Sequence, residues 1–225
     1  MSKSEERRTF PAWRWVLAAA TAGALAGAAV VYASRPASDN AGAELVSAAD
    51  AACAAKAEQG KAITATATGQ VAALMAADPP VSLADVRFEA PDGKPLAIED
   101  FGGKVLLVNL WATWCAPCRA EMPALDQLQR EKGGAGFEVV AINTMEQGGP
   151  EKPNKFLDEI GVSALARYRD SSRDLFEALK ARGLALGLPA TFLLDREGCL
   201  LALMNGPAEW SSPDAFRVID VAIAG

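Results

Sequence analysis

Two cysteines three positions apart, Cys115 and Cys118, carry the clearest chemistry in this sequence of 225 residues. They follow the apolar stretch at 104–110, which predicts a buried strand, and they precede a run of good helix formers. Cys115 should therefore stand at a helix N-terminus, where free N–H groups and the helix dipole favour the thiolate. Since the thiolate is the form that attacks disulfides, the pair is predicted to perform thiol–disulfide exchange.

A structural disulfide, or one half of a metal site, is the competing interpretation of the pair. A zinc site needs about four nitrogen or sulfur ligands, yet the chain has no histidine and no second Cys-x-x-Cys. A copper centre of the Cys/His kind is disfavoured for the same reason. Redox chemistry is therefore preferred, and no metal is expected.

Two neighbours of the pair have open roles. Glu121 lies one helical turn beyond Cys118, where a partly buried carboxylate could accept the proton that Cys118 loses when it resolves a mixed disulfide. A solvated surface glutamate beside Arg119 fits the same spacing. Trp114, next to Cys115, either packs against the core or forms an apolar wall that docks protein substrates.

The segment Trp-Ala-Thr-Trp-Cys-Ala-Pro-Cys-Arg-Ala-Glu-Met-Pro, at 111–123, resembles the active-site signature of thioredoxin-like proteins of the TlpA type. These are membrane-anchored thiol–disulfide oxidoreductases of the bacterial periplasm, related to the cytochrome c maturation thioredoxins. The resemblance covers about 81–225 and includes further short motifs at 92–94, 101–104, 187–191 and 206–210. It implies an α/β, thioredoxin-like fold, in which helices flank a central mixed sheet with an N-terminal hairpin and a central insertion.

This resemblance also implies roles around the pair. Cys115 becomes the attacking cysteine, Cys118 the resolving one, and Glu121 the buried glutamate that takes the proton. Asn109 departs from ordinary thioredoxins, which carry a buried aspartate at this position. Because an asparagine cannot take a proton, that duty would fall to Glu121 or to water.

Pro189 corresponds to the cis-proline of the family, which lies against the disulfide and offers its backbone to the substrate. From the residues alone, a proline directly before the strand expected at 191–194 fits a strand entry, with trans as the default isomer. Leu188 and Trp114 are the residues expected to dock the substrate.

The other two cysteines, Cys53 and Cys199, allow two interpretations. In an oxidising compartment, four cysteines suggest one reactive pair and one structural bridge. Two free buried thiols are the alternative. The TlpA-type group carries such a bridge, so the resemblance favours a disulfide that clamps an N-terminal extension to the domain.

The N-terminal part of the chain predicts a membrane anchor. Residues 16–33 carry no charge and follow a basic segment, so the expected organisation is a cytoplasmic N-terminus at 1–14 and a transmembrane signal-anchor at 15–34. A cleaved signal peptide is the alternative. A linker at 35–43, a helical extension at 44–80 and the thioredoxin-like domain at 81–225 follow. The net charge of −6 argues against a nucleic-acid partner.

The remaining elements follow from apolar periodicity and turn residues. A helix at 44–59 should end at Gly60, and a second should start near Thr68. Hairpins are expected at 86–98 and 191–204, a parallel strand at 137–143, an edge strand at 165–168, and helices at 155–160, 173–181 and 213–224. Phosphate-loop and dinucleotide motifs are absent from the sequence, so no nucleotide or flavin cofactor is expected.

The sequence thus predicts a monomeric reductant of protein disulfides, anchored in the bacterial inner membrane by a single pass and facing the periplasm. Its pair would be recharged by a membrane thiol reductase. The resemblance implies copper-binding assembly proteins of cytochrome oxidase as targets, with apocytochrome c as the alternative. The alternative from a different class of function is a membrane-tethered module that holds a metal or binds a partner, and whose cysteines do not cycle between thiol and disulfide.

Overall fold

The computed structural model describes residues 48–146 and 148–225. The cytoplasmic N-terminus, the transmembrane signal-anchor and the linker expected at 1–43 lie outside the described residues, as does the start of the helical extension. Within the described ranges, none of the helices combines the length and the apolar character that crossing a bilayer would require.

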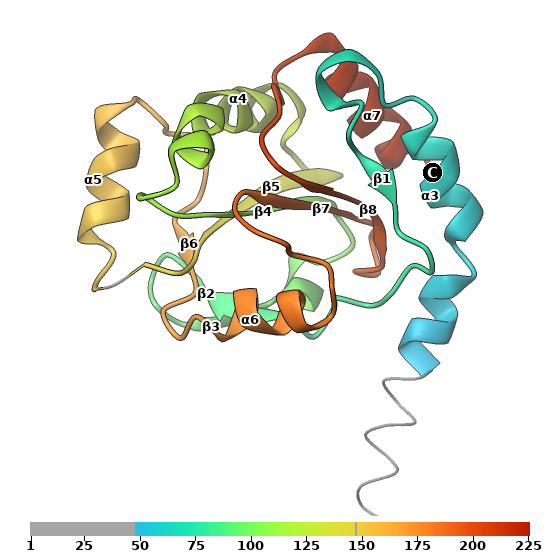
Figure 1. Cartoon of the computed structure of the whole chain (residues 1–225), viewed down its shortest axis with the longest axis horizontal. Coiled ribbons are helices and arrows are strands. Elements are labelled where there is room, and N and C mark those ends of the chain that lie inside the picture. Colours follow the sequence, from blue (N-terminus) through green and yellow to red (C-terminus); the bar gives the residue numbers. More distant parts are fainter. Residues whose placement is uncertain (1–47, 147) are drawn as a thin grey trace, which may run out of the picture. The chain divides into compact units, whose positions relative to one another are not determined.

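A mixed sheet forms the centre of the fold (Figure 1). Its strands lie in the order β1-β8-β7-β4-β5-β6-β2-β3. Strands β4 and β5, and likewise β5 and β6, are parallel, and the other neighbours are antiparallel. The mixed α/β class is therefore confirmed. The bounds are β1 Met75–Ala76, β2 Arg87–Glu89, β3 Pro95–Ala97, β4 Val105–Trp111, β5 Phe137–Asn143, β6 Tyr168–Arg169, β7 Ala190–Leu194 and β8 Leu200–Asn205.

Helices cover both faces of this sheet because its central strands are apolar on both faces. Along β4, Leu107 and Trp111 join the core on one face, and Leu106 and Leu110 join the core on the other. Helices α3 (Ala57–Thr64), α4 (Ala116–Lys132) and α7 (Pro213–Ala224) pack on the first face, and α6 (Asp174–Ala181) packs on the second (Figure 1).

One end of the sheet gathers the segments that could do chemistry. Strand β4 runs toward Cys115, and β7 runs antiparallel to it, so that Leu110 lies opposite Ala190. Strand β8 ends beside the start of β7, with Asn205 opposite Ala190. The loops after β4, β5 and β8 and the segment before β7 therefore meet at the same end.

Several predicted elements are confirmed. Strand β5 and helix α7 have the predicted bounds, and β5 is parallel to β4. The hairpins are present as β2–β3 and β7–β8. These segments carry apolar residues at the spacing that their structure requires and are bounded by turn residues, so local pattern and tertiary packing favour the same structure.

Two expectations in the extension are wrong. Helix α3 does not end at Gly60 but runs through it to Thr64. A Cβ at Gly60 would lie 2.6 Å from the carbonyl oxygen of Leu201, so this glycine permits close packing of α3 on β8. The helix expected from Thr68 is only a 3-10 turn, Gly69–Val71, followed by β1. Pairing of β1 with β8 overrides the helix propensity of this alanine-rich segment.

Two boundaries between β5 and α6 also differ from expectation. Helix α5 spans Glu151–Glu159 and starts four residues early, because Pro153 falls in its first turn, where no N–H bond is needed. The strand expected at the edge is β6, which lies inside the sheet between β5 and β2. Arg169 of β6 donates from Nε and Nη2 to Glu89 Oε2 of β2, at 2.8 Å each, which secures the added hairpin.

Candidate active site

A disulfide joins Cys115 and Cys118 at the start of α4, with a Cα–Cα distance of 5.3 Å. Cys115 is the N-cap of this helix, and its sulfur accepts a hydrogen bond from the backbone N–H of Cys118 at 3.3 Å. Pro117 occupies the first turn, where its missing N–H is not required. The N-terminal amides therefore point toward the sulfur of Cys115, and they favour a thiolate there when the pair is reduced.

The two sulfurs differ in how far solvent can reach them. In the disulfide form Cys115 is 5% exposed, and Cys118 is 0% exposed. Cys115 is thus largely enclosed, because both cysteines join the core beneath α4. Since only Cys115 retains exposed surface, an incoming thiolate can reach Cys115 and not Cys118.

Glu121 lies buried behind the pair, with 3% exposure, so the surface interpretation of this residue does not hold. Its Oε1 accepts a hydrogen bond from Nδ2 of Asn109 at 2.8 Å, and its Oε2 accepts one from the N–H of Ala208 at 3.2 Å. Asn109 belongs to β4, and its Nδ2 also donates to Thr191 of β7 at 3.0 Å. The carboxylate therefore connects α4 with the strand that leads to the cysteines and with the loop after β8.

Burial raises the pKa of Glu121 to about 7. The hydrogen bonds from Asn109 and Ala208 oppose this effect, because they stabilise the charged form. The indole of Trp210 also lowers this pKa, by a smaller amount, although its N–H has no hydrogen-bond partner within normal geometry among the described residues. A carboxylate with this pKa is close to half protonated at neutral pH, which suits a group that accepts and returns a proton.

The peptide bond between Leu188 and Pro189 is cis. The N–H of Gly206 donates to the carbonyl of Pro189 at 2.9 Å, which joins this segment to the end of β8. Pro189 is buried, whereas Leu188 is half-buried and packs against the cores on both faces of the sheet. The antiparallel pairing of β4 and β7 brings this proline to the end of the sheet that carries Cys115.

The comparisons with known proteins agree with this geometry. Residues 75–219 match the family model described as Redoxin. The chain belongs to the Redoxin family. A solved thiol:disulfide interchange protein of the thioredoxin family from Chlorobium tepidum is 27% identical, with a TM-score of 0.52 over 64% of this chain and 97% of that one. The fold of this Redoxin protein is therefore thioredoxin-like.

Curated relatives of this Redoxin protein carry related names. HelX, a thiol:disulfide interchange protein of Rhodobacter capsulatus, is 34% identical over 55% of this chain and 63% of its own length. The thioredoxin-like protein YneN of Bacillus subtilis is 32% identical over 52% and 65%. ResA, a thiol-disulfide oxidoreductase of the same organism, is 30% identical over 52% and 62%. The chain thus spans slightly less than two thirds of the length of these relatives.

Trp114 lies beside the disulfide of this Redoxin protein with 59% of its surface exposed, so it is not a packing residue. Its indole N–H donates to the carbonyl of Met145 at 3.1 Å. Trp111, by contrast, is 1% exposed and packs against Phe156 with ring centroids 6.0 Å apart. Trp114 alone of these two is available to contact another protein.

Two further residues hold the site and were not anticipated from the sequence. Asn205, at the end of β8, accepts from the N–H of Leu186 at 2.7 Å and donates to the carbonyl of Leu184 at 3.1 Å, so it fixes the turn before Pro189. Glu146, in the loop after β5, binds Thr113 near the cysteines. Asn205 ends β8 and Glu146 follows β5, and this position at the end of the sheet that carries the cysteines is the signal that could have indicated them.

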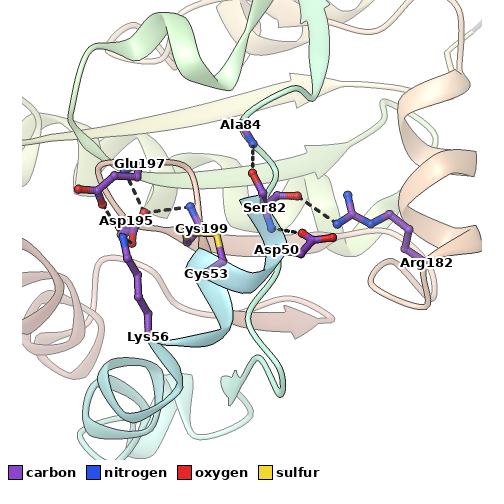
Figure 2. The surroundings of a disulfide bond; sticks show 9 residues. All are labelled: Asp50, Cys53, Lys56, Ser82, Ala84, Arg182, Asp195, Glu197 and Cys199. Atoms are coloured by element: carbon purple, nitrogen blue, oxygen red, sulfur yellow. Dashed lines mark hydrogen bonds and ion pairs between the residues drawn. A yellow bond between two sulfur atoms is a disulfide. The ribbon is translucent and has the colours of Figure 1, made fainter. Parts of the chain in front are cut away.

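The second disulfide joins Cys53 and Cys199, 146 positions apart (Figure 2). Cys53 lies in the helical segment before α3, and Cys199 directly precedes β8. Both are almost completely buried, at 2% and 3% exposure. This bridge therefore attaches the extension to the domain and is separate from the redox pair.

Polar contacts strengthen this attachment on both sides of the bridge (Figure 2). Lys56 pairs with Asp195 and, at 2.6 Å, with Glu197. Asp50 accepts a hydrogen bond from the N–H of Ser82 at 2.8 Å. Together with the sulfur bridge, these contacts secure the extension at several points.

Within residues 48–146 and 148–225, there is no group of three or more histidine, cysteine, aspartate or glutamate side chains that could hold a metal ion. The described site brings together two sulfurs, one buried carboxylate and the backbone around Pro189.

Proposed function

We propose that this Redoxin protein is a thiol–disulfide oxidoreductase that reduces disulfides of other proteins through Cys115 and Cys118. The observation that carries the proposal is the disulfide at the N-terminus of α4, of which only Cys115 has exposed surface. The names of the relatives, which are oxidoreductases and interchange proteins, support it.

In the first step, the Cys115 thiolate attacks one sulfur of a target disulfide. A mixed disulfide forms between Cys115 and the target, and the second target sulfur leaves as a thiolate. The amides at the start of α4 stabilise the attacking charge, and the exposed Trp114 offers an apolar surface for the target.

In the second step, Cys118 resolves the mixed disulfide. The Glu121 carboxylate takes the proton of the Cys118 thiol, directly or through water, and the resulting thiolate attacks the sulfur of Cys115. The target sulfur that was bound to Cys115 leaves as a thiolate, so that both target sulfurs are reduced, and the pair becomes the disulfide seen in the structure. Two electrons pass from the pair to the target. Because the pKa of Glu121 is about 7, the carboxylate can accept this proton and later release it.

We further propose that the protein is anchored in the inner membrane with this domain in the periplasm, where a membrane thiol reductase regenerates the dithiol. The apolar segment at 16–33 and the basic residues before it support this location. Copper-binding assembly proteins of cytochrome oxidase are the proposed targets, by resemblance to the TlpA type. Apocytochrome c is the alternative target, since the same exchange chemistry would reduce it.

The test is capture of the mixed disulfide. The Cys118→Ser variant, expressed in bacterial membranes, should accumulate disulfide-linked complexes because it cannot resolve them. The double variant Cys115→Ser/Cys118→Ser should accumulate none. Copper-binding proteins in the captured set would support the first target class, and apocytochromes would replace it with the second. If Cys118→Ser captures nothing and the reduced protein instead binds stoichiometric metal, the exchange mechanism is wrong and a metal-holding module is favoured.

A further inference from the structure

Glu146 makes a dense set of contacts next to the redox pair. It lies in the loop after β5, and only 7% of its side chain is exposed. Its Oε2 accepts hydrogen bonds from the backbone N–H of Thr113 at 2.9 Å and from Oγ1 of the same residue at 2.7 Å. Its Oε1 accepts one from Nζ of Lys152, in α5, at 2.6 Å. A single carboxylate thus joins α5 to the segment two residues before Cys115.

The neighbouring residue of the same loop holds Trp114. Met145 adopts a left-handed backbone conformation, with φ of 57°, which is uncommon for a residue other than glycine. Its carbonyl accepts the indole N–H of Trp114 at 3.1 Å. Its side chain packs against the core on the α6 face of the sheet. Such a conformation persists only where the surroundings enforce it, and the Glu146 contacts and this packing do so.

Two consecutive residues of the loop after β5 therefore hold two consecutive residues of the loop after β4. Glu146 fixes Thr113, and Met145 fixes Trp114, immediately before the attacking cysteine. Trp114 nevertheless leaves 59% of its surface exposed. A large apolar side chain that is held in one orientation and left exposed is suited to contact with another protein, because little rotamer freedom is lost when the partner binds.

We propose that Glu146 is a positioning residue for substrate proteins: through Thr113 and the adjoining Met145 carbonyl it holds Trp114 in its docking orientation, and through Lys152 it links that orientation to α5. This inference rests on the proposed function, in which Trp114 contacts the target. Glu146 takes no part in the exchange itself. Its loss should weaken the binding of protein disulfides and leave the reaction with a small disulfide intact.

The test compares a protein disulfide with a small one in the full-length protein. Reduction of insulin by the wild-type dithiol gives KM and kcat for a protein disulfide, and 5,5′-dithiobis(2-nitrobenzoate) reports the reactivity of Cys115 without docking. For Glu146→Ala we expect KM for insulin to rise about tenfold, kcat to change less than about twofold, and the rate with the small disulfide to stay within about twofold.

Two further variants separate the contacts of Glu146. Thr113→Val removes only the hydroxyl donor and Lys152→Met only the ion pair, so each should raise KM for insulin about threefold. Lys155→Met is the matched control. It changes a lysine of the same helix whose amine lies 3.8 Å from Glu159, and it should leave KM unchanged. Thr113→Val also keeps the inference testable if Glu146→Ala fails to fold.

Depolarisation of Trp114 fluorescence reports the local mobility of this side chain, and a general loss of stability would not change it. The signal of Trp114, obtained as the difference between each protein and its Trp114→Phe version, should depolarise faster in Glu146→Ala than in the wild type. An unchanged KM and an unchanged depolarisation in Glu146→Ala would overturn the inference. Equal losses with insulin and the small disulfide would also overturn it, since Glu146 would then act on the sulfurs. If the wild type reduces neither substrate, or if Cys115→Ser reduces insulin equally well, the proposed function itself fails.

Discussion

Nδ2 of Asn109 donates a 2.8 Å hydrogen bond to Oε1 of Glu121, and both side chains are almost completely buried. A neutral amide thus faces the buried carboxyl group that lies behind the redox pair. The amide lowers the pKa of Glu121 against the larger, opposing effect of burial, and the result is about 7. An uncharged neighbour therefore tunes the pKa of the buried carboxyl group.

Replacing Asn109 by leucine removes this hydrogen bond while approximately keeping the side-chain volume. The pKa of Glu121 should rise further above 7, by about one unit, because a lost hydrogen bond of about 1.4 kcal/mol corresponds to that change. The pH at which the resolving step reaches half its maximal rate should rise equally, as measured by single-turnover release of a labelled peptide. Thr191→Val, which removes only the other partner of Asn109, should leave this midpoint in place. A midpoint that stays near 7 in Asn109→Leu would exclude Glu121 as the titrating group.

Replacing Glu121 by glutamine should slow the resolving step by about 100-fold, because a positioned proton acceptor contributes a factor of that order. Formation of the mixed disulfide by Cys115 should change little, since Glu121 is not part of the attacking sulfur's environment in the proposed mechanism. Rapid quenching with acid, followed by mass spectrometry, separates the two steps. Accumulation of the mixed disulfide is the expected signature, and slowing of the first step alone would contradict the assignment.

Glu121 should also make stability depend on pH. Its pKa is about 7 in the folded chain against an ordinary value of 4.5, so the folded state holds this proton more tightly. The resulting stabilisation is fully present below pH 4.5 and is lost as the pH rises through 7, by up to about 3 kcal/mol. Urea unfolding of the disulfide form at pH 5 and pH 8 measures it. The difference between the two pH values should be smaller in Glu121→Gln, and an equal difference in both proteins would refute the burial argument.

Removing the second disulfide, in Cys53→Ala/Cys199→Ala, should cost stability without affecting exchange. Closing a loop of this length is worth ~5 kcal/mol in the chain-entropy model, and the measured loss should be smaller because Lys56 still pairs with Asp195. Insulin reduction should stay within about twofold of the wild type at a temperature where both proteins are folded. A loss of exchange under those conditions would mean that the bridge serves the redox site.

Gly60→Ala tests the close packing of α3 on β8. Alanine is the better helix former by about 1 kcal/mol, but its Cβ would lie 2.6 Å from the carbonyl oxygen of Leu201. We expect a net loss of about 2 kcal/mol in the free energy of unfolding, since overpacking outweighs propensity. Glu58→Ala, at an exposed position of the same helix, should change stability by less than about 0.5 kcal/mol. A stabilised Gly60→Ala protein would show that the backbone can move apart at little cost.

The parts of the fold that could be predicted are those whose local signals agree with their packing. Strand β5 is apolar except for Glu138 and Asn143 and lies between a glycine-rich turn and a polar loop, and α7 starts with Ser212 as N-cap and a proline in the first turn. By contrast, β1 has only two residues, and its existence depends on pairing with β8. Non-local pairing of so short a segment leaves no periodicity in the sequence.

The residues of the candidate site also differ in whether the sequence alone could reveal them. Cys115 and Cys118 could be identified from their Cys-x-x-Cys spacing. The cis bond before Pro189 could be expected only from family resemblance. Glu146 and Asn205 could not be identified, because each acts on a residue distant in sequence through hydrogen bonds that only the assembled sheet brings within reach. A lone acidic residue in a loop rich in glycine and proline looks like an ordinary solvated side chain.

The outermost strands of the sheet, β1 and β3, are two and three residues long, and β3 begins with Pro95. Long, regular outer strands expose rows of unpaired amides and carbonyls that invite main-chain pairing with other polypeptides. Strand β8 would be such a template, had β1 not covered it. By pairing with β8, the short strand from the extension leaves, among the described strands, no long outer strand on that side of the sheet with which another polypeptide could pair.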